Sequence, residues 1–225
     1  MRSLFVALRA LVAAAVVAAI AGQLATSAGF WQARGVGNIA SNVVNFFSFF
    51  TVESNAASAV VLAVGAVRLL RRRQDSVAFG MARASVTTYM VVTGIVYNIL
   101  LRGVELPQGS TLGWSNEVLH VVAPLYLLVD WVFAPGRIPL RPGRIATILV
   151  FPIVWVVYSL VRGPFVVDEV YGNDFWYPYP FLNPETSAGG YLSVSAYVVL
   201  IAAVIALVAA GVLWMSRRPT TTRRL

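Results

Sequence analysis

Two polar residues in otherwise apolar segments have the chemistry of a nucleophile and its base. Thr51 lies in the stretch FFSFFTVESN, residues 46–55, and His120, the only histidine, lies in WSNEVLHVVAP, residues 114–124. A threonine hydroxyl attacks a carbonyl only when a base removes its proton, and neutral imidazole, with an ordinary pKa of about 6.5, is suited to that task. The pair therefore predicts acyl transfer by the logic of serine–histidine hydrolases.

Polar residues recur with helical spacing around Thr51. Ser48, Thr51, Asn55 and Ser58 are separated by three, four and three residues, which places them on one face of a helix. Because polar groups against lipid are costly, we expect this stripe to face the interior of a bundle. Glu53 lies about 200° around the helix from Thr51, so we expect it to point elsewhere and to reach the site only where the helix is irregular.

Other polar residues are candidates for supporting roles at the same site. Asn116 and Glu117 precede His120 by four and three residues, so both share its side of a helix and either one can orient the imidazole ring. An ester under attack develops an oxyanion, which needs hydrogen-bond donors. Three side chains are candidates for that role: Asn55, Tyr97 and Asn98.

Each of these residues also has a structural interpretation. Threonines in membrane helices usually donate to a carbonyl one turn earlier, and an isolated histidine often hydrogen-bonds a neighbouring helix. Asp130 is similarly open: it is a candidate to line the same space, and its structural interpretation is a residue at the membrane interface or the partner of an arginine. The spacing alone leaves the catalytic and the structural interpretation open.

The elements that must position these residues are membrane-spanning helices. Of the 225 residues, 59% are hydrophobic and only 12% are charged, a balance typical of membrane proteins. A spanning helix needs roughly 20 apolar residues. The sequence predicts an all-α, polytopic membrane protein, a six-transmembrane-helix bundle in a single domain, with spans at about 4–24, 43–70, 83–102, 114–133, 144–162 and 190–214.

The arginines predict the orientation of these spans. All 17 basic residues are arginines, and most of them fall at one set of predicted helix ends, which is the positive-inside pattern. We expect both termini and the loops near 71–82 and 134–143 to be cytoplasmic in the plasma membrane. Exterior loops are expected at about 25–42, 103–113 and 163–189. The cytoplasmic set is Arg2, Arg9, Arg68, Arg71, Arg72, Arg73, Arg83, Arg137, Arg141, Arg144, Arg217, Arg218, Arg223 and Arg224, and the exterior set is Arg34, Arg102 and Arg162.

The first predicted span has an alternative interpretation. Residues 1–29 have a basic start, an apolar run and small residues near Ala25 to Ala28, which also describes a secretory signal peptide. The apolar run is long for a signal peptide, so we favour a retained helix. Cleavage would leave five helices without altering the others.

Composition also limits cofactors and partners. The chain has no cysteine, no lysine and a single histidine, which excludes disulfides, thiolate nucleophiles and Schiff bases and argues against histidine-rich metal sites and bis-histidine haem. We therefore predict no cofactor and no metal. The net charge of +8 is explained by membrane orientation, so no nucleic acid partner is expected. The expected partners are the bilayer and a lipid substrate, and the oligomeric state stays open.

The longest exterior segment, 163–189, combines acidic residues with aromatic residues and prolines. Three prolines between positions 178 and 184 rule out a regular helix there. We favour an aromatic belt at the lipid headgroups for this segment, with a lid folded over a cavity as the alternative. The aromatic residues concerned are Trp176, Tyr177, Tyr179 and Phe181.

Three stretches together resemble a known family. FFSFFTVESN, WSNEVLHVVAPLYLLVDW and FWYPYPFLNP are similar, in this order along the chain, to the androgen-induced family of integral-membrane threonine hydrolases and its bacterial six-helix relatives. The resemblance implies cleavage of fatty acid esters of hydroxy fatty acids. It also implies that Thr51 is the nucleophile and His120 its support, and it places the family's aromatic signature on Trp176, Tyr179, Pro180 and Phe181.

The sequence therefore predicts an integral-membrane lipid-ester hydrolase with a Thr51–His120 site. The substrate would enter sideways from the outer leaflet, with Trp176 and Tyr179 among the residues that bind it. A small-solute transporter is an alternative, but it would require a polar path through both leaflets, and the polar residues gather in the outer half. A non-catalytic lipid-binding protein shares every feature except reactivity.

Overall fold

The computed structural model describes residues 1–104 and 109–218 of the chain. Residues 105–108 of the predicted exterior loop, and Arg223 and Arg224 of the predicted cytoplasmic tail, lie outside this part. Within it the fold is all-α without a strand, and six helices are long and apolar enough to cross a membrane. The chain is therefore a multi-pass membrane protein with the predicted six-helix architecture.

The spans are formed by α1 (Arg2–Ala33), α3 (Phe50–Leu70), α4 (Val77–Val96) with the π-helix η1 (Tyr97–Leu101), α5 (Gly113–Glu117) with the π-helix η2 (Val118–Val122) and α6 (Ala123–Phe133), α7 (Ile145–Arg162) and α8 (Tyr191–Ser216). The remaining helical segments are short: α2 (Ile39–Phe47) and the 3₁₀ turns η3 (Pro142–Arg144), η4 (Gly163–Phe165) and η5 (Pro180–Leu182). Side-chain caps begin two of the helices, since Asn38 accepts from the amide of Ser41 before α2 and Ser76 accepts from the amide of Phe79 before α4.

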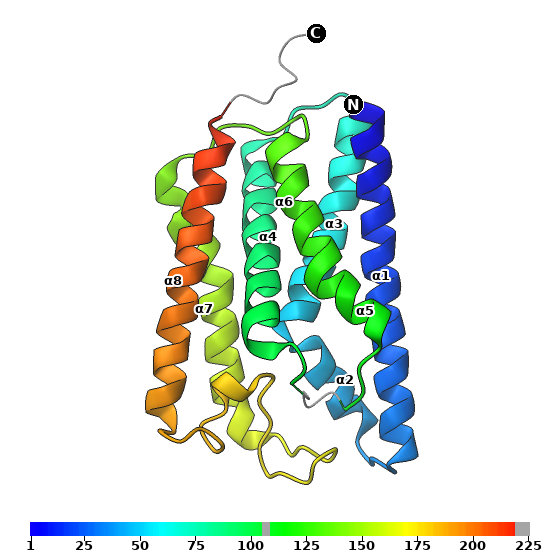
Figure 1. Ribbon diagram of the computed structural model, residues 1–225, viewed down its shortest axis with the longest axis vertical. Helices are drawn as coiled ribbons and strands as arrows, with labels where there is room; N and C mark the ends of the chain where they lie inside the picture. Colours follow the sequence, from blue (N-terminus) through cyan, green and yellow to red (C-terminus); the bar gives the residue numbers. More distant parts are fainter. Residues whose placement is uncertain (105–108, 219–225) are drawn as a thin grey trace.

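The two ends of the bundle differ in character (Figure 1). The start of α1, the end of α8 and the α3–α4 and α6–α7 connections gather at one end, which we call the arginine-rich end. At the other end lie α2 and the long segment 163–190, and we call this the loop end. The candidate residues Thr51, Tyr97, His120 and Tyr179 all belong to the half of the bundle nearer the loop end.

Helix boundaries near the loop end differ from the prediction. The first helix continues to Ala33 and α2 begins at Ile39, so the predicted loop at 25–42 is wrong for most of its length. The second predicted span, 43–70, is not continuous, because Phe49 is extended (φ −71°, ψ 127°) between α2 and α3. The break is stabilised by Trp155, whose indole Nε1 donates to the carbonyl of Ser48 at 3.0 Å.

The break also changes the predicted polar stripe. The Ser48 hydroxyl lies 2.9 Å from the hydroxyl of Tyr158 on α7, whereas Thr51 faces segment 163–190. Thr51, Asn55 and Ser58 remain on the buried face of α3. Ser48 therefore belongs to a different contact from the rest of the stripe, because the helix that was expected to connect them is interrupted.

Two arginines that the sequence placed at helix ends are buried inside the bundle. The third span begins at Val77 rather than at 83, so Arg83 lies almost two turns within α4. Arg9 on α1 and Arg83 are 2% and 3% exposed, and both bind Asp130 on α6. Asp130 is thus an arginine partner, one of the roles that the sequence left open. Arg83 also pairs with Asp75, which lies 3.6 Å from Arg68.

We call Arg9, Arg68, Asp75, Arg83 and Asp130 the charge cluster. Arg9 donates to the two oxygens of Asp130 at 2.7 and 3.0 Å and to the carbonyl of Gly65 on α3 at 2.8 Å. The cluster therefore joins α1, α3, α4 and α6. Because Arg9 supplies a counter-ion to a buried carboxylate, α1 packs as an integral helix of this bundle. Its retention stays a prediction.

Three of the aromatic residues in segment 163–190 fold inward. Trp176, Tyr177 and Tyr179 are each 5% exposed or less, so the favoured prediction of a headgroup belt is wrong and the lid alternative describes their position. Phe49 anchors them, with its ring 5.6 Å from the rings of Trp176 and Tyr179 in edge-to-face geometry. Gly163 admits the Tyr177 ring so closely that any Cβ there would collide with it.

Candidate functional site

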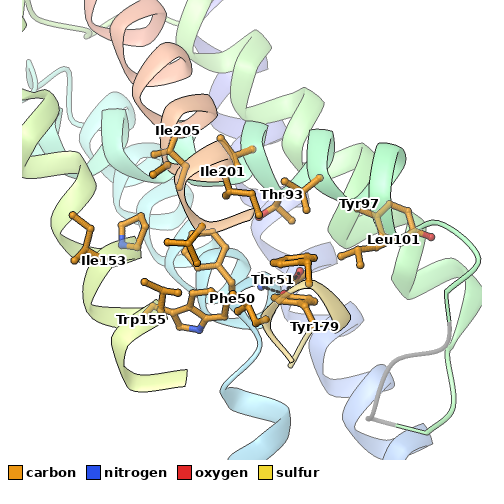
Figure 2. A pocket seen from close by; sticks show the side chains of 18 of the residues that line it. Phe50, Thr51, Thr93, Tyr97, Leu101, Ile153, Trp155, Tyr179, Ile201 and Ile205 are labelled. Carbon is orange, nitrogen blue, oxygen red and sulfur yellow. Dashed lines mark hydrogen bonds between the residues drawn. The ribbon is translucent and has the colours of Figure 1, made fainter. Parts of the chain in front are cut away.

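Thr51 is the second residue of α3, directly after the break at Phe49. The first amide groups of a helix have no partner within it, and here the Tyr179 hydroxyl accepts from the Thr51 amide at 3.2 Å. The same hydroxyl lies 3.1 Å from Thr51 Oγ1 (Figure 2). Tyr179 thus caps α3 and holds the Thr51 side chain in one orientation.

The environment of Tyr179 keeps its phenol protonated. Its side chain is buried, and this burial raises the pKa of Tyr179 to about 12, while the hydrogen bonds from Thr51 act in the opposite direction. A phenol that stays protonated at neutral pH donates a hydrogen bond and does not act as a base. Tyr179 can therefore position Thr51 or stabilise an oxyanion, but it cannot take the Thr51 proton.

His120 lies in the π-helical segment η2, which has a local cause. Pro124 has no amide hydrogen for the carbonyl of His120, and the amide of Ala123 instead donates five residues back, to Val118. Gly94 on α4 lets this segment approach, since a Cβ there would stand 3.3 Å from the His120 carbonyl and 3.1 Å from Pro124 Cβ. Single π-turns of this kind occur frequently at functional sites.

The hydrogen bonding of His120 fixes its tautomer. Nδ1 lies 2.9 Å from the backbone carbonyl of Asn116, and a carbonyl oxygen only accepts, so Nδ1 carries the proton of the neutral ring. This leaves Nε2 as the basic nitrogen. Asn116 and Glu117 were the two residues predicted to orient the ring. Asn116 contacts it, but through its backbone carbonyl and not its side chain.

Tyr97 covers one face of the imidazole. Its ring stacks on His120 with centroids 4.0 Å apart and planes inclined by 26°. Tyr97 begins η1, the other π-helical segment. Its phenol oxygen accepts from the Asn116 side-chain amide. Because the amide is the donor in that contact, the Tyr97 hydroxyl hydrogen is available to another acceptor.

Two cavities meet at these residues. The first, which we call the polar cavity, has a volume of about 440 Å³ and is lined by Thr51, Tyr97, Asn116, His120 and Tyr179 among others. The second, which we call the apolar pocket, has a volume of about 100 Å³ and shares Thr51, Tyr97, Leu101 and Tyr179 with the first (Figure 2). The structure thus brings Thr51 and His120 to one cavity, but their hydrogen-bond partners are Tyr179 and Asn116 rather than each other.

Asn55 was predicted as an oxyanion donor, but its side chain is used elsewhere. It is fully buried, and its side-chain amide donates to the carbonyls of Thr51 at 2.9 Å and Leu119 at 3.1 Å. Both amide hydrogens are therefore used, one within α3 and the other in joining α3 to η2. Neither cavity has Asn55 in its lining, so its position indicates a structural role.

Glu117 and Asn98 lie outside both cavities as well. Arg102 binds the two oxygens of Glu117 at 2.9 and 3.2 Å and the side-chain oxygen of Asn98 at 3.0 Å. These three residues are exposed, and Arg102 stands 5.1 Å over the Tyr97 ring. They form an outer wall behind Tyr97 rather than a surface that touches a ligand.

Two further predicted residues are not brought to the junction of the cavities. Glu53 is half-buried with one oxygen unpaired, and it lines neither cavity, which agrees with the expected direction of its side chain. Trp176 lines a separate hollow of about 290 Å³ on the segment 163–190. Of the predicted aromatic pair, Tyr179 alone reaches Thr51.

Gln23 on α1 was missed by the sequence reasoning. It lines the polar cavity, donates to the carbonyl of Ser110 at 2.6 Å and accepts from the amide of Leu112 at 2.9 Å. It therefore ties the segment before α5 to α1. A glutamine within the apolar run of the first span was the available signal.

We compared the chain with known protein families, curated proteins and solved structures. No family model, no curated protein and no solved structure matches this chain. The resemblance to the androgen-induced family therefore stays a prediction that depends on the three stretches quoted above.

Proposed function

We propose that the chain is an integral-membrane lipid-ester hydrolase in which Thr51 is the nucleophile and His120 the base. The observation that carries the proposal is that both side chains line the polar cavity, with Thr51 also at the apolar pocket. In the proposed orientation the arginine-rich end is cytoplasmic, in the plasma membrane, and the site lies in the outer half. Fatty-acyl esters, such as fatty acid esters of hydroxy fatty acids, are the proposed substrates.

The proposed reaction has two halves. His120 Nε2 takes the proton of Thr51 as Oγ1 attacks the ester carbonyl, and the imidazolium then protonates the departing alcohol, which leaves an acyl-threonine. His120 next takes a proton from water, the resulting hydroxide attacks the acyl-threonine, and the proton returns to Thr51 as the fatty acid leaves. Thr51 must first exchange Tyr179 for His120 as its partner, and catalytic hydrogen bonds often shorten only when substrate is bound.

Two phenols stabilise the oxyanion in the proposed reaction. Tyr97 has a free hydroxyl hydrogen because its oxygen accepts from Asn116, and the Tyr179 oxygen accepts from the Thr51 amide. Both rings line the polar cavity beside Thr51. A donor fixed before the reaction costs no reorganisation when charge develops on the carbonyl oxygen.

The proposal is tested by labelling purified protein with a fluorophosphonate probe and by measuring ester hydrolysis. Thr51→Val keeps the shape of the side chain, and we expect it to abolish labelling. His120→Gln should lower hydrolysis by about a hundredfold or more. Thr88→Val is the matched control, because Thr88 is fully buried on α4, donates to the carbonyl of Ala84 and lines neither cavity. Undiminished labelling of Thr51→Val would end the proposal.

A non-catalytic lipid-binding protein is the second candidate. It is favoured by one observation, that the Thr51 hydroxyl bonds to Tyr179 and not to His120. This candidate predicts that wild-type protein binds lipid esters without consuming them and that the probe labels no threonine. The experiment above therefore separates the two candidates without a further variant.

A further inference from the structure

The apolar pocket has polar side chains at one side and apolar walls elsewhere. Its polar lining side chains, Thr51, Tyr97 and Tyr179, belong to the side shared with the polar cavity, and Thr93 lies beside them (Figure 2). The walls from α7 and α8 are apolar: Trp155 contributes an indole ring, and the aliphatic side is formed by residues that include Ile153 and Ile205. A ligand that enters from the aliphatic side therefore meets the Thr51 hydroxyl at its inner end.

The aliphatic side faces the surroundings of the bundle. Ile153 lines the pocket and is nevertheless 53% exposed, so it forms part of the rim. Ala202 on α8 also lines the pocket, and its small side chain leaves space opposite α7. Both residues lie within membrane-spanning helices, so the material outside this rim is the hydrocarbon of the bilayer.

The size of the pocket limits what it holds. An apolar cavity of about 150 Å³ accommodates one benzene ring, so the pocket of about 100 Å³ takes roughly four chain carbons on the same scale. Lipid tails are as apolar as these walls, so entry from the bilayer gains no hydrophobic energy. The contribution of such a pocket is to fix the position of the carbonyl that follows those carbons.

We infer that the apolar pocket binds the first few acyl carbons of a linear lipid ester, whose remaining chain passes between α7 and α8 into the bilayer. The inference rests on the proposed function and assigns the two sides of the ester. The acyl side lies in the apolar pocket, the carbonyl lies at Thr51, and the alcohol side lies in the polar cavity beside His120. Acyl length beyond roughly four carbons then has little effect on the rate, because those carbons touch lipid rather than protein.

The first test places a large side chain in the pocket. Ala202→Phe fills it, and Ala203→Phe, one residue further on α8 and exposed, is the matched control. The assay compares methylumbelliferyl acetate, butyrate, octanoate and palmitate. We expect Ala202→Phe to lower hydrolysis of butyrate and longer esters by about tenfold or more relative to acetate. We expect Ala203→Phe to match wild type on every ester.

The second test needs no turnover. A palmitate ester with a diazirine on the fourth acyl carbon is photolysed with Thr51→Val protein, and the labelled peptides are identified by mass spectrometry. We expect the label on α7 and α8, with loss of that label when Ala202→Phe is added and no loss when Ala203→Phe is added. Gel filtration of each variant confirms that it is folded.

The outcomes separate the inference from the proposed function. Hydrolysis that needs Thr51 but shows no label on α7 or α8, and no change of chain preference in Ala202→Phe, would overturn the inference and leave the hydrolase intact. Label on α7 and α8 that depends on position 202, without hydrolysis by any protein, would remove the hydrolase and support the pocket as a chain-binding site.

Discussion

The bundle contains two buried polar regions, and they use their hydrogen-bonding capacity differently. In the charge cluster Arg9 binds both oxygens of Asp130 and the carbonyl of Gly65, while Arg83 bridges Asp130 and Asp75. In the Thr51–His120 region, His120 Nε2 and the Tyr97 hydroxyl hydrogen have no partner among the described residues. The first region connects helices, and the second faces a cavity.

The helices reflect the same difference. The charge cluster is held by regular parts of α1, α3, α4 and α6 together with Asp75 in the α3–α4 connection. Tyr97 and His120 instead lie in the π-helical segments η1 and η2. A buried ion pair is costly unless every group is paired, whereas open donors beside a cavity cost less because a ligand or water can satisfy them. We therefore interpret the cluster as structural and the cavity region as functional.

The comparison is tested most strongly by Asp130→Ala. Removing this carboxylate leaves Arg9 and Arg83 buried without their shared partner, so we expect a loss of about 3–5 kcal/mol in the free energy of unfolding. Thermal unfolding in detergent, followed by gel filtration, measures the loss. Hydrolysis per folded molecule should stay near wild type, since Asp130 lines neither cavity.

A compensated variant sharpens this test. Replacing Arg9, Arg83 and Asp130 together by Met, Met and Leu removes the charges along with their partners, and we expect it to be more stable than Asp130→Ala. Asp75 and Arg68 remain to pair with each other. A triple variant as unstable as Asp130→Ala would show that unpaired charge is not the cause.

Tyr179→Phe tests the other region. It removes one hydroxyl that contacts Thr51, so we expect a stability loss of only about 1 kcal/mol. Catalysis should respond far more, with kcat falling about a hundredfold and KM little changed, as for an oxyanion donor. Tyr177→Phe is the control, because Tyr177 is buried in the same segment and lines neither cavity. Equal effects of the two substitutions would contradict a specific role for Tyr179.

The smallest expected effect on stability is that of Asp168→Asn. Asp130 is bound by arginines, whereas Asp168 is bound by backbone amides, so this variant compares the two kinds of buried carboxyl group. Asp168 is buried and accepts from the amides of Val170 and Tyr171. Burial is the main cause that raises the pKa of Asp168 above its ordinary value of 3.8, and the backbone hydrogen bonds oppose it.

The sign of the resulting pH dependence follows from proton binding. Between the unfolded and the folded pKa the folded state binds more protons, so the free energy of unfolding falls as pH rises through that interval and is constant above it. Asparagine keeps the acceptor oxygen and has no charge, so Asp168→Asn should remove this decline and change stability little at lower pH. Unfolding measured across the acidic range checks it, and a decline that persists in Asp168→Asn would assign it to another group.

Much of the fold was predictable from the sequence because its causes are local. Hydrocarbon requires long apolar helices, so composition and run length alone predicted six spans. The spacing of Thr51, Asn55 and Ser58 likewise predicted the buried face of α3, whereas Glu117, expected on the side of His120, is exposed. The π-turn at His120 also has a local cause in Pro124, although a proline within an apolar run does not by itself distinguish a π-turn from a kink.

Other features were decided only when distant segments met. Arg9 and Arg83 were assigned to solvent at helix ends, and it is Asp130, more than forty residues from either, that makes their burial stable. Tyr179 lies 128 residues from Thr51 and became its partner only because Phe49 breaks the helix and exposes the first amides of α3. Composition and periodicity determine which residues leave water for the membrane. Which of them turn from lipid toward one another depends on the neighbours that each helix acquires, and only the tertiary structure sets those neighbours.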